Sequence, residues 1–140
     1  MIIVRNATTE TIELNGGALA GNSTAFKNLI WNGAFDLWQR GTSIAVASSK
    51  YTCDRWVLVY VGSGFNNNVD RDTDVPTLAQ VGTQLKYSAK ITVNTAKSVS
   101  GVDAAIFRTH IIGYDFAQLH LKTFTVSFWV KSNLTGLYSV

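Results

Sequence analysis

The segment Gln84-Leu-Lys-Tyr-Ser-Ala-Lys-Ile-Thr-Val-Asn94 decides the fold class of this chain. Apolar side chains occupy every second position of the segment, and polar side chains fill the positions between them. A period of two is typical of a β-strand that has one face in a core and the other in water. The segment therefore predicts a strand with an inward-facing row, which consists of Leu85, Tyr87, Ala89, Ile91 and Val93.

Other segments add strands to this first one. Residues 56–61 form a continuous apolar run, short enough for a buried strand, and residues 104–112 and 124–130 alternate. The inward row of the last segment is predicted to be Phe124, Val126, Phe128 and Val130. Residues 29–35 are apolar apart from Asn32-Gly33 and predict a strand with a bulge or bend.

No long helix is predicted. Residues 113–119 are too few for an independent helix and predict a single turn between two strands. Several strands with long connections favour an all-β fold, an antiparallel β-sandwich, over residues 28–140. Residues 1–27 predict an N-terminal arm or attachment segment, with short strands at residues 2–4 and 11–14 and a turn at Asn15-Gly-Gly17.

Composition argues against several classes of protein. Twelve Lys and Arg against nine Asp and Glu give a net charge of +3 over 140 residues, but the basic residues are scattered, so we predict no nucleic-acid partner. No apolar run approaches the ~20 residues needed to span a bilayer, and no signal peptide is evident. The single cysteine, Cys53, is expected to be a small buried thiol.

Catalytic and metal-binding patterns are weak. His110 and His120 have no Cys or carboxylate pair beside them, and we expect His110 on a strand surface and His120 in a turn. Asp70, Asp72 and Asp74 alternate and offer calcium ligands, but the Gly and distal Glu of a calcium loop are missing. A solvated loop or edge strand is the favoured interpretation. No pair of carboxylates suggests a glycosidase, so we predict no enzyme, metal or cofactor.

Aromatic side chains are the remaining candidates for a binding role. Trp31, Trp38 and Trp129 could stack on the apolar face of a sugar, and Trp129 lies on the polar side of its strand. Burial in the core and an oligomer interface are the alternatives for these rings. Asp54-Arg55-Trp56 favours a structural role, either an Asp–Arg pair or an Arg stacked on Trp at the entry to a strand.

Three stretches together resemble one family. Asn28-Leu-Ile-Trp-Asn-Gly-Ala-Phe-Asp-Leu-Trp-Gln-Arg-Gly41 is similar to the opening N-L-x-x-N-G-x-F-x-x-x-Q-R-G of modules in bacteriophage tail fibres and related virion proteins. Tyr51-Thr-Cys-Asp-Arg-Trp56 resembles their Y-T-x-D-R-W, and residues 112–116 and 122–132 resemble their later E-G-x-x-x-x-L and K-x-x-T-L-S-F-W-V-K-S segments. The resemblance assigns a structural role to six motif residues: Asn32, Gly33, Phe35, Asp54, Arg55 and Trp56.

The resemblance implies a jelly-roll sandwich in a virion fibre or appendage, made in the host cytoplasm and assembled as a homo-trimer with other virion tail proteins. Some such modules recognise host surface glycans, so a carbohydrate-binding module with adhesion as its main role is the alternative function. Some relatives hold a structural calcium near the first motif. Asp36 is the nearest carboxylate here, and we do not predict that it binds one.

The family pattern continues with further strands after the segment that corresponds to residues 122–132. Either residues 28–140 are a sandwich truncated at its C-terminus, which is the favoured interpretation, or partner chains complete the sheet. Such a half-built sandwich leaves an uncovered Phe/Val face. A polysaccharide depolymerase is a third hypothesis, which lacks a carboxylate pair in this sequence.

Overall fold

The computed structural model describes residues 2–6, 28–117, 119–135 and 139, except for the side chains of residues 2–6. Within these residues the chain is mostly β, which confirms the predicted class. The elements are β1 (Ile2–Asn6), β2 (Ser43–Val46), β3 (Lys50–Tyr51), β4 (Val57–Val61), β5 (Asn67–Asp72), α1 (Leu78–Val81), β6 (Ser88–Val93), β7 (Ala104–Arg108), α2 (Gly113–Phe116) and β8 (Phe124–Phe128). The predicted strand at residues 11–14 and the turn at residues 15–17 lie outside the described residues.

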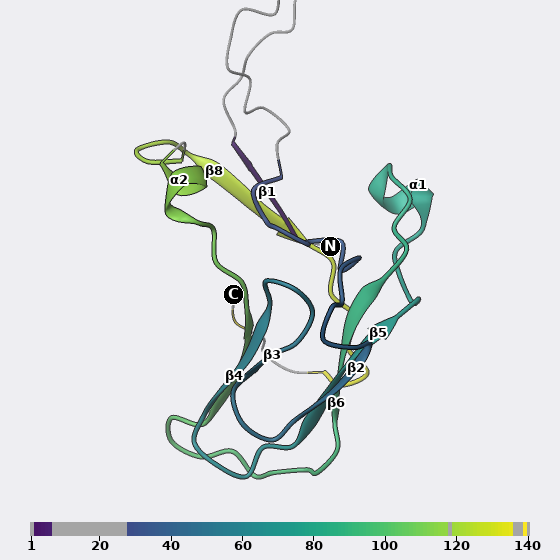
Figure 1. Cartoon of the computed structure of the whole chain (residues 1–140), viewed down its shortest axis with the longest axis vertical. Coiled ribbons are helices and arrows are strands. Elements are labelled where there is room, and N and C mark those ends of the chain that lie inside the picture. Colours follow the sequence, from purple (N-terminus) through teal and green to yellow (C-terminus); the bar gives the residue numbers. More distant parts are fainter. Residues whose placement is uncertain (1, 7–27, 118, 136–138, 140) are drawn as a thin grey trace, which may run out of the picture.

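The strands pair into two three-stranded sheets and one two-stranded ribbon. The sheet orders are β2-β5-β6 and β3-β4-β7, and β1 pairs with β8. Every pairing is antiparallel, as predicted. In Figure 1 the two sheets lie on opposite sides of the lower half of the molecule, and the β1–β8 ribbon lies above them. The predicted arm thus contributes one strand, β1, to the ribbon.

The hydrophobic core takes side chains from both sheets. Ile44 and Val46 of β2 and Val69 of β5 belong to the same buried cluster as Leu58 of β4, and Phe107 of β7 packs against it. The alternation of buried and exposed residues along β2 follows from the period-two geometry of a strand. Leu58 of the central strand β4 and Val69 of the central strand β5 are almost fully buried, and so is Val46 of the edge strand β2.

Residues 29–35 do not form the predicted strand. Residues 31–34 are a turn, closed by the Phe35 N–H donating to the Asn32 carbonyl at 3.1 Å. Asn32 and Phe35 have φ of 52° and 58°, a left-handed conformation that no strand accepts. The apolar residues Leu29, Ile30 and Phe35 are buried all the same, because the turn packs into the core. The single turn predicted at residues 113–119 is confirmed as α2.

The predicted inward rows are only partly buried. Leu85, Tyr87 and Ala89 are half-buried, whereas Ile91 and Val93 at the far end of β6 are exposed. Phe124, Val126, Phe128 and Val130 are all exposed, so the prediction that this row faces a core is wrong for the described chain. The reason is position: β6 is an edge strand, and β8 has a single partner strand, β1.

The Cys53 thiol is fully buried, as predicted, and this leads to a chemical expectation. Burial raises the pKa of Cys53 to about 12, so the reactive thiolate is scarce in the folded protein. A disulfide reagent such as Ellman's reagent should therefore react with one thiol per chain in urea and with almost none in buffer. Because the unfolded thiol ionises first, the free energy of unfolding should also fall as the pH rises from about 8.5 toward 12. Rapid labelling of the folded protein would contradict both expectations.

No helix in the described part of the chain has the length and apolar character required to cross a membrane.

Candidate functional site

The two motif segments meet at Asn32. Its side-chain amide donates to the carbonyl oxygens of Leu37 at 3.0 Å and Asp54 at 2.9 Å, and its Oδ1 accepts from the Leu37 N–H at 3.0 Å. One side chain therefore fastens the turn at residues 31–34 to the turn that contains Asp54. Its left-handed backbone is one that asparagine adopts more readily than most residues.

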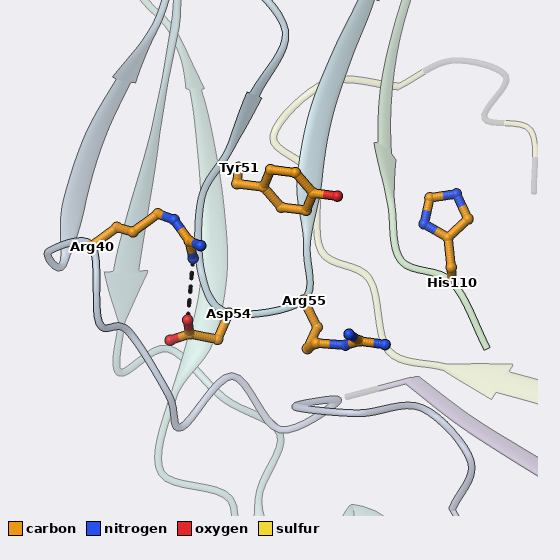
Figure 2. A pocket seen from close by; sticks show the side chains of 5 residues that line it. All are labelled: Arg40, Tyr51, Asp54, Arg55 and His110. Carbon is orange, nitrogen blue, oxygen red and sulfur yellow. Dashed lines mark hydrogen bonds and ion pairs between the residues drawn. The ribbon is translucent and has the colours of Figure 1, made fainter. Parts of the chain in front are cut away.

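Asp54 pairs with a different arginine from the one that the sequence suggested. Its carboxylate accepts from Arg40 Nη1 at 3.1 Å and from the Gln39 N–H at 2.8 Å. The neighbouring Arg55 has φ of 72°, which carries its side chain away from Asp54 (Figure 2). The predicted Asp54–Arg55 pair is thus wrong, and Arg40, which lies 14 residues before Asp54, supplies the charge.

Aromatic rings pack on the core side of the junction, which is the contact between the turn at residues 31–34 and the turn that contains Asp54. The ring of Trp56 lies 5.1 Å from Phe35 and 5.0 Å from Phe107, and its Nε1 donates to the Asn32 carbonyl at 3.2 Å. Gly33 is buried beside them. The six motif residues therefore include four, Asn32, Gly33, Phe35 and Trp56, that lie in or against the core. Asp54 lies at its margin and Arg55 faces solvent.

The three candidate sugar-stacking tryptophans do not form one site. Trp38 is only 9% exposed and donates from Nε1 to the Phe35 carbonyl at 2.5 Å, so little of its ring is accessible to a sugar. Trp31 is 55% exposed, with its Nε1 bonded to Asp115 Oδ2 at 3.1 Å, and Trp129 is 48% exposed just beyond β8. Among the described residues, no ring contact joins Trp31 to Trp129.

Two of the three alternating aspartates lie on a central strand, which corrects the prediction for them, whereas Asp74 lies in the loop after β5, as predicted. Asp70 and Asp72 belong to β5, the central strand of its sheet. Asp70 accepts from Ser43 Oγ at 2.5 Å, Asp72 pairs with Lys90 at 3.1 Å, and Asp74 pairs with Lys131 at 2.6 Å. Hydrogen bonds from the Asp74 backbone and from Lys90 lower the pKa of Asp72. Across the described residues, no group of three His, Cys, Asp or Glu is placed to hold a metal ion.

A surface pocket of about 360 Å³ lies beside the junction. Its lining residues come from separate parts of the chain and are Arg40, Tyr51, Asp54, Arg55 and His110 (Figure 2). His110 was expected on a strand, but β7 ends at Arg108 and His110 follows in the next loop. Arg40, Tyr51 and Arg55 all belong to the two motifs, which is the signal that could have grouped them. Nothing in the sequence pattern links His110 to these residues.

No family model, curated protein or solved structure matches this chain. The similarity to tail-fibre modules therefore stays a prediction, based on the three motifs in the sequence.

Proposed function

We propose that this chain is a structural component of a bacteriophage tail fibre or related virion appendage, in which copies of a jelly-roll sandwich assemble as a homo-trimer. The observation that carries the proposal is the exposed apolar row of β8. The resemblance of the motifs to tail-fibre modules is the basis for proposing a virion particle and an assembly of three copies.

The β8 row consists of Phe124, Val126 and Phe128, which share one face of the strand because side chains alternate. Each is at least 40% exposed, and Ile91 and Val93 of β6 are exposed as well. Apolar area left in water costs about 25 cal/mol per Å² relative to burial, and such strands favour association. The alternating pattern of β8 predicts a buried apolar face, yet that face is exposed in the single chain. Contact with identical copies in a fibre would cover it.

The assembly is tested by native mass spectrometry of the whole 15.3 kDa chain. We expect a species of three chains, and we expect Val126→Glu to convert it to the monomer because a carboxylate replaces the apolar isopropyl group in the row. Thr125→Glu is the matched control, since it adds the same charge to the other face of the same strand. A monomeric wild-type chain, or equal effects of both variants, would count against the assembly.

Membership of the particle is tested separately. Virions purified from the phage that encodes the chain should contain it, as detected by peptide mass spectrometry and by antibody labelling in electron micrographs. Labelling should be confined to the tail or its appendages. Absence from purified particles would leave the motif resemblance without functional meaning.

A second candidate function, glycan adhesion, is favoured by the exposed rings of Trp31 and Trp129. A glycan array compares the wild type with Trp129→Ala and Trp31→Ala. Binding that either variant abolishes supports adhesion, whereas binding that both variants retain excludes these rings as the contact.

A further inference from the structure

The pocket beside Asp54 is an open surface hollow, and charged side chains and one aromatic ring line it. It measures about 360 Å³, and pockets that bind small ligands range from roughly 300 to 1,000 Å³. Its walls come from the turn that contains Arg40, from β3 with Tyr51, from the turn at residues 53–56 and from the loop with His110. Figure 2 shows the Tyr51 ring above Arg55, with His110 on the far side.

The pocket has a surplus of positive charge. The only carboxylate in its wall, Asp54, is already paired with Arg40 at 3.1 Å. No described residue forms an ion pair or hydrogen bond with the guanidinium of Arg55 or the imidazole of His110. An exposed guanidinium such as that of Arg55 is matched in geometry to a carboxylate or phosphate group, which it can bind through two hydrogen bonds.

The backbone holds Arg55 in a conformation that glycine would adopt at less cost. Its φ is 72°, and the turn is fixed by Thr109 Oγ1 donating to the Arg55 carbonyl at 2.8 Å and by the Trp56 N–H donating to the Cys53 carbonyl at 3.0 Å. A long charged side chain at a strained position is a feature of binding sites, where the strain is part of how a group is presented. Here it presents the guanidinium to the pocket.

The exposed ring of Tyr51 offers an apolar surface, which an inorganic anion would not use but the ring of a larger ligand could contact. Its ring is exposed, and Arg40 lies over it at 5.6 Å from the ring centroid. An aromatic ring next to a cation suits a ligand that has an apolar ring face and a negative group, as a sugar acid does.

From these observations we infer that the pocket binds the anionic group of a surface saccharide, a carboxylate or a phosphate, with Arg55 and His110 holding the oxygens and Tyr51 covering the sugar ring. This inference deepens the second candidate function, glycan adhesion, by naming a site that includes neither Trp31 nor Trp129, and it is independent of the assembly because a single folded chain contains the whole pocket.

The test is a titration of the full ¹⁵N-labelled chain, followed by NMR, with four probes: glucuronate, its neutral methyl ester, glycerol 3-phosphate and inorganic phosphate. We expect saturable shifts at Arg55 and His110 with a dissociation constant of about 1 mM for at least one anion, and none for the ester. Preference for glucuronate identifies a uronic acid, and preference for glycerol 3-phosphate identifies a phosphate-bearing glycan. Absence of saturable shifts with every anion, or equal binding of the ester, overturns the inference.

Three variants separate binding from folding. Arg55→Gly removes the guanidinium and relieves the left-handed backbone, so it should weaken binding about tenfold or more without loss of stability. Arg71→Gln is the control, because it removes a guanidinium that lies outside the pocket, over the Tyr87 ring at 4.3 Å. Tyr51→Ala should weaken binding of glucuronate and leave inorganic phosphate unaffected. Retention of binding by Arg55→Gly, or an equal loss in Arg71→Gln, contradicts the inference.

Discussion

Replacing Trp56 with alanine should lower the free energy of unfolding by about 3–5 kcal/mol. Trp56 is 1% exposed, its ring contacts Phe35 and Phe107, and its Nε1 binds the Asn32 carbonyl. The variant loses the buried ring, leaves a cavity between the two sheets and leaves a carbonyl without its donor. Since small domains have a total stability of about 5–15 kcal/mol, this loss is a large fraction of the stability of the protein.

Urea unfolding followed by circular dichroism measures this loss, because fluorescence would change with the removal of any tryptophan. Trp31→Ala is the control: it removes the same side chain from an exposed position and costs a single hydrogen bond, about 1 kcal/mol. Equal losses in the two variants would show that the Trp56 cluster does not organise the core.

Local patterns in the sequence predicted those features that depend on neighbouring residues. The continuous apolar run at residues 56–61 predicted a buried strand, and β4 is buried at Val57 and Leu58 but becomes exposed toward Val61. Alternation predicted the strands β6 and β8, because successive side chains of a strand point to opposite faces. Burial of Cys53 followed from its place at the start of that apolar run.

Other features depend on which segments meet, and no local pattern contains that information. The apolar residues around Asn32 have the composition of a strand, yet two left-handed residues turn the chain there. The partner of Asp54 is Arg40 because the Asn32 amide draws the two turns together. The exposure of the β8 row is likewise set by what lies beside the strand. The pocket was missed because His110 reaches it only through the pairing of β7 with β4.

Asn32 should be the most sensitive polar position in the chain. Its side chain makes three hydrogen bonds, to the backbone of Leu37 and Asp54, and its backbone has φ of 52°. Asn32→Ala removes all three bonds and places a residue less suited to this conformation there, so we expect a loss of about 3 kcal/mol in urea unfolding.

Two further substitutions separate the hydrogen bonds from the backbone. Asn32→Gly loses the same bonds but tolerates the left-handed conformation, so it should be more stable than Asn32→Ala by about 1 kcal/mol. Asn32→Asp keeps the acceptor for the Leu37 N–H but turns an oxygen toward two carbonyls, and should cost at least as much as alanine. If Asn32→Gly were as stable as the wild type, the hydrogen bonds of the Asn32 amide would not be what joins the two turns. The left-handed backbone alone would then explain why the motif has asparagine at this position.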